Sequence, residues 1–113
     1  MLRMKIVCRT GIGLASAVLA VAVAVPALAA TPVGDAKKGK VVFAANCVAC
    51  HTFKAGGGKG TIGPNLDKAK PGYKLVILRV TNGKGVMQPF KGILTKTQIQ
   101  DVAAFIYATT KKP

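Results

Sequence analysis

The chain has 113 residues, of which 17 are Lys or Arg and three are Asp or Glu, giving a net charge of +14. A structural zinc site usually has two paired clusters of Cys and His ligands, but the only cysteine outside residues 47–51 is Cys8, and the chain has no second histidine. The length allows one small domain. The positive charge points to an anionic partner: nucleic acid, membrane or an acidic protein surface.

The first 29 residues have the three parts of a secretory signal peptide. Residues 1–9 are basic, residues 11–25 are uncharged and mostly apolar, and an A-x-A site ends at Ala29. An uncleaved anchor helix is the alternative, because the apolar run nearly reaches the roughly 17–25 residues that span a bilayer. The A-x-A site favours cleavage after Ala29, which leaves a domain of residues 30–113 with no stable membrane insertion.

Positive charge persists in this domain, because three of the 17 basic residues and none of the three acids lie in the signal peptide. The remaining net charge is +11, with lysines scattered along the chain and Arg79 as the single arginine. Base readout favours arginine, and export from the cytoplasm disfavours nucleic acid as a partner. We therefore expect partners with acidic protein surfaces, and no nucleic acid.

Cys47-Val48-Ala49-Cys50-His51 has the spacing of a c-type haem attachment motif. Residues i and i+3 of a helical turn project from the same side, so Cys47 and Cys50 can both form thioethers with one porphyrin edge. His51 then points its ring nitrogen at the iron. A thioredoxin-like pair would need a βαβ setting, which the sequence does not indicate, and a chance match stays open at this point.

An exported domain this small usually needs a stabilising element beyond its core. The predicted mature chain has no cysteine outside the motif with which to form a disulfide. A covalent haem would provide that element, so we expect the apoprotein to be largely unfolded.

The first predicted helix runs from residue 36 towards residue 47, with Asp35 as its N-cap. Gly39 inside it should cost about 0.5–1 kcal/mol relative to alanine. It is either an uncompensated defect or the point where another helix crosses very closely. Phe43 would lie on the same face.

The last predicted helix follows Thr95, which forms a capping box with Gln98. Its buried stripe has the i, i+3, i+4, i+7 spacing. The stripe consists of Ile99, Val102, Ala103 and Ile106. Phe105, at the edge of the stripe, is expected to pack near Gly39.

Between these helices the sequence is less informative. Residues 55–60 are rich in glycine but lack the Ser or Thr that completes a phosphate-binding loop, so they predict a flexible loop. Residues 71–83 favour a helix, with Pro71 in its first turn and Gly83 as its C-terminal cap. A buried strand is the alternative, because this segment is rich in β-branched residues.

Met87 is the only methionine of the predicted mature chain and lies in a loop rich in turn-forming residues. A lone methionine is more often a core residue than a ligand. A His-ligated haem, however, has a second axial position, and a thioether there raises its potential. Met87 follows His51 by 36 residues and could close over the opposite haem face.

The chain resembles the class I c-type cytochromes over essentially all of its predicted mature region. It looks most similar to the small cytochromes that carry electrons to photosystem I and to their bacterial relatives. The matching residues are Gly39 with Phe43, Cys47–His51, Gly63-Pro64-Asn65-Leu66, Asn82–Met87 and Asp101–Phe105. It departs from the family at Gln88, where proline is common, and in its basic charge, because many photosynthetic members are acidic.

This resemblance implies an all-α, small monohaem cytochrome c fold of about three to four helices, with the first and last helices crossing. It implies one haem c held covalently by Cys47 and Cys50. By the same resemblance, His51 and Met87 are the axial iron ligands, and the carbonyl of Pro64 orients His51.

The implied function is that of an exported, monomeric electron carrier with no enzymatic activity and no catalytic residues. A cytochrome complex would be its donor and an oxidase or photosystem its acceptor. The compartment would be the periplasm, the thylakoid lumen or the outer face of the cytoplasmic membrane. The alternative is a haem-based sensor or peroxidase-like enzyme with an open sixth position, but the chain has no second histidine as a distal acid–base group.

Overall fold

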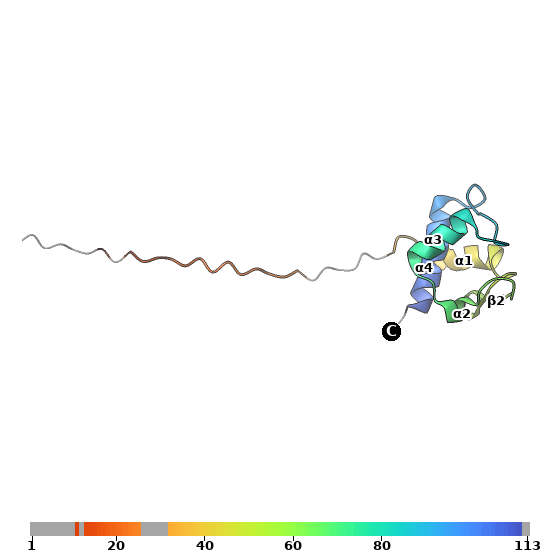
Figure 1. Cartoon of the computed structure of the whole chain (residues 1–113), viewed down its shortest axis with the longest axis horizontal. Coiled ribbons are helices and arrows are strands. Elements are labelled where there is room, and N and C mark those ends of the chain that lie inside the picture. The colour runs from red at the N-terminus through yellow and green to blue at the C-terminus, as the bar shows by residue number, and fades with distance from the viewer. Residues whose placement is uncertain (1–10, 12, 26–31, 112–113) are drawn as a thin grey trace, which may run out of the picture.

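The computed structural model describes residues 11, 13–25 and 32–111. In this part of the chain, four helices surround a small core, and a two-stranded antiparallel ladder lies between the first two helices (Figure 1). The elements in chain order are α1 (Ala36–Asn46), β1 (Thr52–Phe53), η1 (Lys54–Gly56), β2 (Gly58–Lys59), α2 (Leu66–Ala69), α3 (Tyr73–Asn82) and α4 (Lys96–Thr110). The predominance of helix confirms the predicted fold class.

Helix α1 begins where the sequence predicts. The side chain of Asp35 accepts hydrogen bonds from the backbone N–H groups of Lys37 and Lys38, at 2.9 and 3.2 Å. It therefore satisfies two of the donors that the first turn of a helix leaves without partners.

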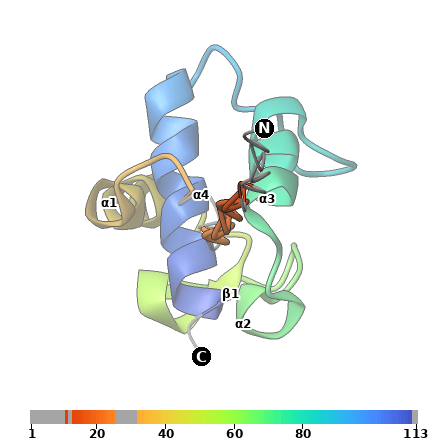
Figure 2. The same cartoon turned by 90° about the vertical axis from the view of Figure 1, so that its left-hand side faces the viewer.

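Helices α1 and α4 form the most extensive contact between elements. Figure 2 shows α1 almost end-on beside α4, so the two helices cross steeply. Gly39 lies at the crossing, where the Asp101 carbonyl oxygen takes the space that a Cβ would occupy, and a Cβ would also approach the Phe105 Cβ to 2.8 Å. The close crossing predicted from Gly39 is confirmed, as is the packing of Phe105 there.

Asp101 adds a polar link to this crossing. Its side chain is 4% exposed, and it accepts a hydrogen bond of 2.7 Å from the backbone N–H of Asp35. A buried carboxylate needs such a donor, because an unpaired one is costly away from water. The link joins the start of α1 to the middle of α4.

Helix α4 has the predicted capping box, with reciprocal hydrogen bonds between Thr95 and Gln98 of 2.9 and 3.1 Å. All four residues of the predicted stripe are buried, and so is Phe105. Phe43, Phe53 and Phe105 meet edge to face, with ring centroids 5.2 to 6.0 Å apart. This aromatic cluster is the centre of the core.

Residues 55–60 are more ordered than the predicted flexible loop. Thr52 pairs with Lys59 and Phe53 with Gly58, and η1 lies between the two strands. A Cβ on Gly56 would meet the ring of Phe43. The glycines therefore let the hairpin lie against the aromatic core, and a flexible loop was the wrong prediction.

Two further differences concern α2 and α3. Helix α2 is a single turn that was not predicted from the sequence, although the side chain of Asn65 caps it through the Lys68 N–H at 3.2 Å. The segment for which a helix was favoured over a strand is helix α3, as predicted. Gly83, with a φ of 68°, is its C-terminal cap. Its N-cap is Gly72, so Pro71 precedes the helix instead of lying in its first turn.

The predicted signal peptide lies partly outside the described residues. Residues 1–10, 12 and 26–29 are not described, and the predicted cleavage site is among them. Residues 13–25 form neither helix nor strand. Across the described ranges, no helix combines the length and apolar character needed to cross a membrane. The division into residues 1–29 and 30–113 stays a prediction.

Candidate haem-binding site

The predicted attachment motif forms a tight turn at the end of α1. Cys47 is the C-cap of the helix, and its carbonyl accepts hydrogen bonds from the N–H groups of Cys50 and His51, at 3.2 and 3.0 Å. The turn brings both thiols and the imidazole to the wall of one cavity. This is the geometry that two thioethers on one porphyrin edge require.

The cavity has a volume of about 720 Å³ and is lined mainly by apolar side chains. That size and character are typical of cofactor sites. The attachment turn forms one wall, α3 another, and the segment from residue 84 to residue 88 a third. All five residues predicted for the haem site, which are Cys47, Cys50, His51, Pro64 and Met87, line this cavity.

The His51 ring is fixed by its neighbours on the segment before α2. Its Nδ1 lies 2.7 Å from the backbone carbonyl oxygen of Pro64. A carbonyl only accepts, so Nδ1 carries the proton and the lone pair of Nε2 is free for a metal. Gly63 lies directly against the ring, because a Cβ there would be 2.6 Å from the ring Cε1.

Met87 is held in its loop by backbone geometry. Lys84 and Met87 exchange two N–H to carbonyl hydrogen bonds, both of 3.0 Å. Gly83 and Gly85 have φ angles of 68° and 59°, which residues with a Cβ rarely adopt. Gln88 also lines the cavity, and Phe90 two positions later is buried and donates its N–H to the Val80 carbonyl at 2.8 Å.

The Cys47 thiol does not have the lowered pKa of a redox-active cysteine. Burial raises the pKa of Cys47 to about 12, and the charge of a neighbouring Cys50 thiolate adds to this. Redox-active thiols need a lowered pKa, because the thiolate is the nucleophile. Within the described residues, no three His, Cys, Asp or Glu side chains gather where a metal ion could sit, so a zinc site is unsupported there as well.

Sequence reasoning missed the contribution of α3 to this cavity. Leu75, Val76, Arg79 and Val80 line it from one face of the helix. Their i, i+1, i+4, i+5 spacing was visible in the sequence. Arg79 brings a positive charge to an otherwise apolar wall, and nothing in the sequence pattern assigned it to the site.

The helix crossing, the attachment turn and the apolar cavity together define a small c-type cytochrome domain with one haem. A protein-family model described as "Cytochrome C oxidase, cbb3-type, subunit III" matches residues 34–106. The chain belongs to this family of c-type cytochromes.

Relatives and solved structures agree with this assignment. The chain is 40% identical to cytochrome c6 of Leptolyngbya boryana, with 69% of this chain and 96% of that protein covered. It is similar to the c-type cytochrome SorU from Sinorhizobium meliloti, at 34% identity and a TM-score of 0.63, covering 68% of this chain and 92% of that one. It is also similar to cytochrome c6 from the diatom Phaeodactylum tricornutum, at 35% identity and a TM-score of 0.58, covering 69% and 97%.

These similarities confirm the main functional predictions. The fold is the small monohaem cytochrome c fold, and the cofactor is a covalently bound haem c with its iron. The protein is a haem electron carrier that exchanges electrons between redox partners.

Proposed function

We propose that Cys47 and Cys50 bind the haem through thioethers and that His51 and Met87 are the axial ligands of its iron. The observation that carries this proposal is that the single methionine and the single histidine of residues 30–113 line one cavity. The hydrogen bond from Nδ1 of His51 to Pro64 supports it, because that bond leaves Nε2 free. The paired backbone hydrogen bonds at Met87 support it too, because they fix the backbone that carries the Met87 side chain.

The haem iron supplies a one-electron ferric–ferrous couple. The residues set its properties: the Met87 thioether raises the potential, and the Pro64 carbonyl makes His51 a more basic ligand. With His51 and Met87 both holding the iron, small molecules would be kept from it. We therefore propose a carrier that performs no bond chemistry on a substrate and has no catalytic residue.

Substitution of Met87 by leucine tests this assignment, because leucine is similar in size but cannot bind iron. In the haem-loaded protein, Met87→Leu should let ferrous iron bind carbon monoxide readily and should lower the midpoint potential. Ile93→Leu, at an exposed residue that does not line the haem cavity, is the control and should change neither. If the wild type itself binds carbon monoxide readily, the sixth position is open and a sensor or enzyme becomes the better assignment.

We propose acidic redox proteins as partners, with a cytochrome complex as donor and an oxidase or photosystem as acceptor. Arg79 and Lys84 line the haem cavity, and the three acidic residues of the chain do not. Charge steering accelerates encounters and is screened by salt. Electron-transfer rates with an acidic partner should therefore fall steeply as ionic strength rises, and rates indifferent to salt would contradict the docking proposal.

We propose that the protein is exported and that the signal peptide is cleaved after Ala29. It would then work in the periplasm, the thylakoid lumen or at the outer face of the cytoplasmic membrane. The basic, apolar and A-x-A segments of residues 1–29 support this. Mass spectrometry of the native protein should find Ala30 at the amino terminus, whereas a chain that retains the apolar segment would be a tethered carrier.

A further inference from the structure

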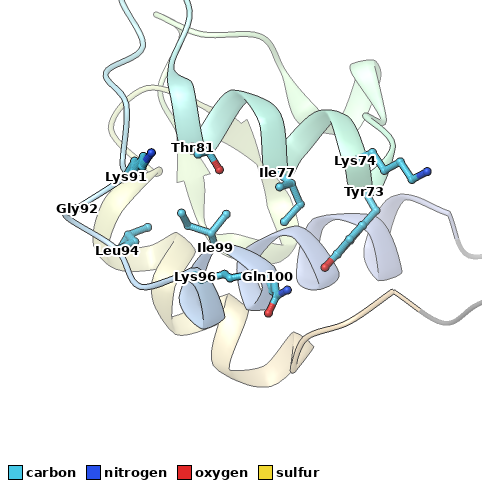
Figure 3. Close-up of a pocket in the computed structure, with 10 residues that line it drawn as sticks. All are labelled: Tyr73, Lys74, Ile77, Thr81, Lys91, Gly92, Leu94, Lys96, Ile99 and Gln100. Carbon is cyan, nitrogen blue, oxygen red and sulfur yellow. The ribbon is translucent and has the colours of Figure 1, made fainter.

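A second cavity lies between α3 and α4, and we call it the α3–α4 groove. Its volume is about 560 Å³. Its apolar floor consists of Ile77 of α3, Leu94 of the loop before α4 and Ile99 of α4. Figure 3 shows these three side chains in the space between the helices. Ile77 and Leu94 are half-buried, so the floor is open to a partner.

Lysines surround this floor. Lys74, Lys91 and Lys96 line the groove and are exposed. In Figure 3, Lys74 lies at one end of the groove and Lys91 at the other. An apolar floor between separated positive charges fits a partner with an apolar group between negative charges.

The acids of the chain do not neutralise these lysines. The chain has three acidic residues, and none of them lines the groove. The carboxylates of Asp35, Asp67 and Asp101 each accept hydrogen bonds from backbone N–H groups elsewhere. The positive charge of the groove is therefore available to a binding partner.

The α3–α4 groove is separate from the haem cavity, because no residue lines both. Helix α3 divides them. Tyr73, Lys74 and Ile77 face the groove, whereas Val76 and Arg79 face the haem cavity. A partner bound in the groove would leave the attachment turn and the Met87 loop uncovered.

We propose that the α3–α4 groove binds an acidic peptide segment of a partner protein, through one apolar side chain flanked by carboxylates. A membrane lipid fits less well, because its long acyl chain needs a continuous apolar channel and lysines stand at both ends of this floor. The segment would tether the carrier to its partner and leave the haem face free to exchange electrons. This is a second contact, independent of the docking proposed around the haem.

The test uses haem-loaded, ferrous, ¹⁵N-labelled protein at low ionic strength and a short peptide in which glutamates flank a single leucine. Amide shifts should concentrate in α3 and in residues 91–100, and should spare residues 47–51 and 84–88. Replacing the leucine of the peptide by serine should weaken binding. Shifts centred on the haem cavity, or no binding, would overturn the proposal.

Variants distinguish the contribution of the groove lysines to peptide binding from that of the net charge of the protein. The triple substitution K74Q/K91Q/K96Q should weaken peptide binding about tenfold, equivalent to about 1.4 kcal/mol. The control K37Q/K40Q/K68Q removes the same charge from exposed lysines outside both cavities, and should change binding less than about twofold. Equal losses in the two triple variants would show that charge alone drives binding, and binding to phosphatidylglycerol vesicles but not to the peptide would assign the groove to lipid. Either result would overturn the proposal.

Discussion

Gly63 lies so close to the His51 ring that a single methyl group tests the site. A Cβ at residue 63 would lie 2.6 Å from the ring Cε1 and 2.9 Å from its Nδ1. Carbon atoms pack at about 3.5 Å or more. In Gly63→Ala the ring and the backbone must therefore move apart by about 0.9 Å. Pro64 follows Gly63 directly, so the same displacement disturbs the 2.7 Å hydrogen bond from Nδ1 to its carbonyl.

The expected loss of stability follows from these two effects. Overpacking of a well-packed site costs about 1–3 kcal/mol, and loss of one hydrogen bond costs about 0.5–1.5 kcal/mol. A total of about 3 kcal/mol lowers the melting temperature of a domain this size by roughly 12–24 °C. The midpoint potential should rise, because a less basic His51 stabilises ferric iron less.

Thermal melting of the haem-loaded protein, followed by circular dichroism, measures this loss. Gly72→Ala is the control, since no atom lies within 4 Å of its added Cβ and its φ of −69° suits alanine. As an N-cap change it should cost less than about 1 kcal/mol. If Gly63→Ala melts together with the wild type and keeps its potential, Gly63 does not position His51.

Three further predictions concern the fold. Gly39→Ala should lower the melting temperature, because the added Cβ would overlap the Asp101 carbonyl oxygen. Helix propensity alone would raise stability by about 0.5–1 kcal/mol, so the sign of the change tests whether α1 and α4 cross this closely. Burial, with Asp101 nearby, raises the pKa of Tyr73 above 10.0. The free energy of unfolding of wild type should therefore exceed that of Tyr73→Phe by its full amount below pH 10.0, and this difference should be lost as pH rises through the folded-state pKa of Tyr73. Urea titrations that find the same difference at every pH would contradict this. The apoprotein should be largely unfolded, and a cooperative melt of haem-free protein by circular dichroism would refute the stabilising role of the haem.

Local signals predicted the ends of the domain well. The Asp35 N-cap and the Thr95–Gln98 capping box depend on residues close in sequence, and both helices begin where predicted. Gly39 was informative because a glycine inside a helix needs a reason. The structure supplies that reason through the Asp101 carbonyl.

The middle of the chain was harder to predict because its structure depends on distant contacts. The hairpin at residues 52–59 is ordered by Phe43, which lies in another element, so local composition indicated only a loop. Pro71 was placed in the first turn of α3, although the helix begins two residues later at Tyr73, because Pro71 and Gly72 are both compatible with a helix start.

The candidate haem site was predicted from a short motif and a family resemblance. Cys47, Cys50 and His51 form one turn, so their proximity follows from spacing. Met87 and Pro64 reach the same cavity only through tertiary folding, and the resemblance, not the spacing, brought Pro64 to the site. The face that α3 adds, with Arg79, was not predicted because a helical stripe does not reveal what it packs against.

Absorption spectroscopy shows whether His51 and Met87 both coordinate the haem iron. Haem-loaded protein would be recorded in both oxidation states, before and after addition of cyanide or carbon monoxide. We expect a weak far-red band from sulfur–iron charge transfer in the ferric state and little response to either ligand. Absence of that band, together with ready binding of carbon monoxide to ferrous protein, would show that Met87 does not hold the iron.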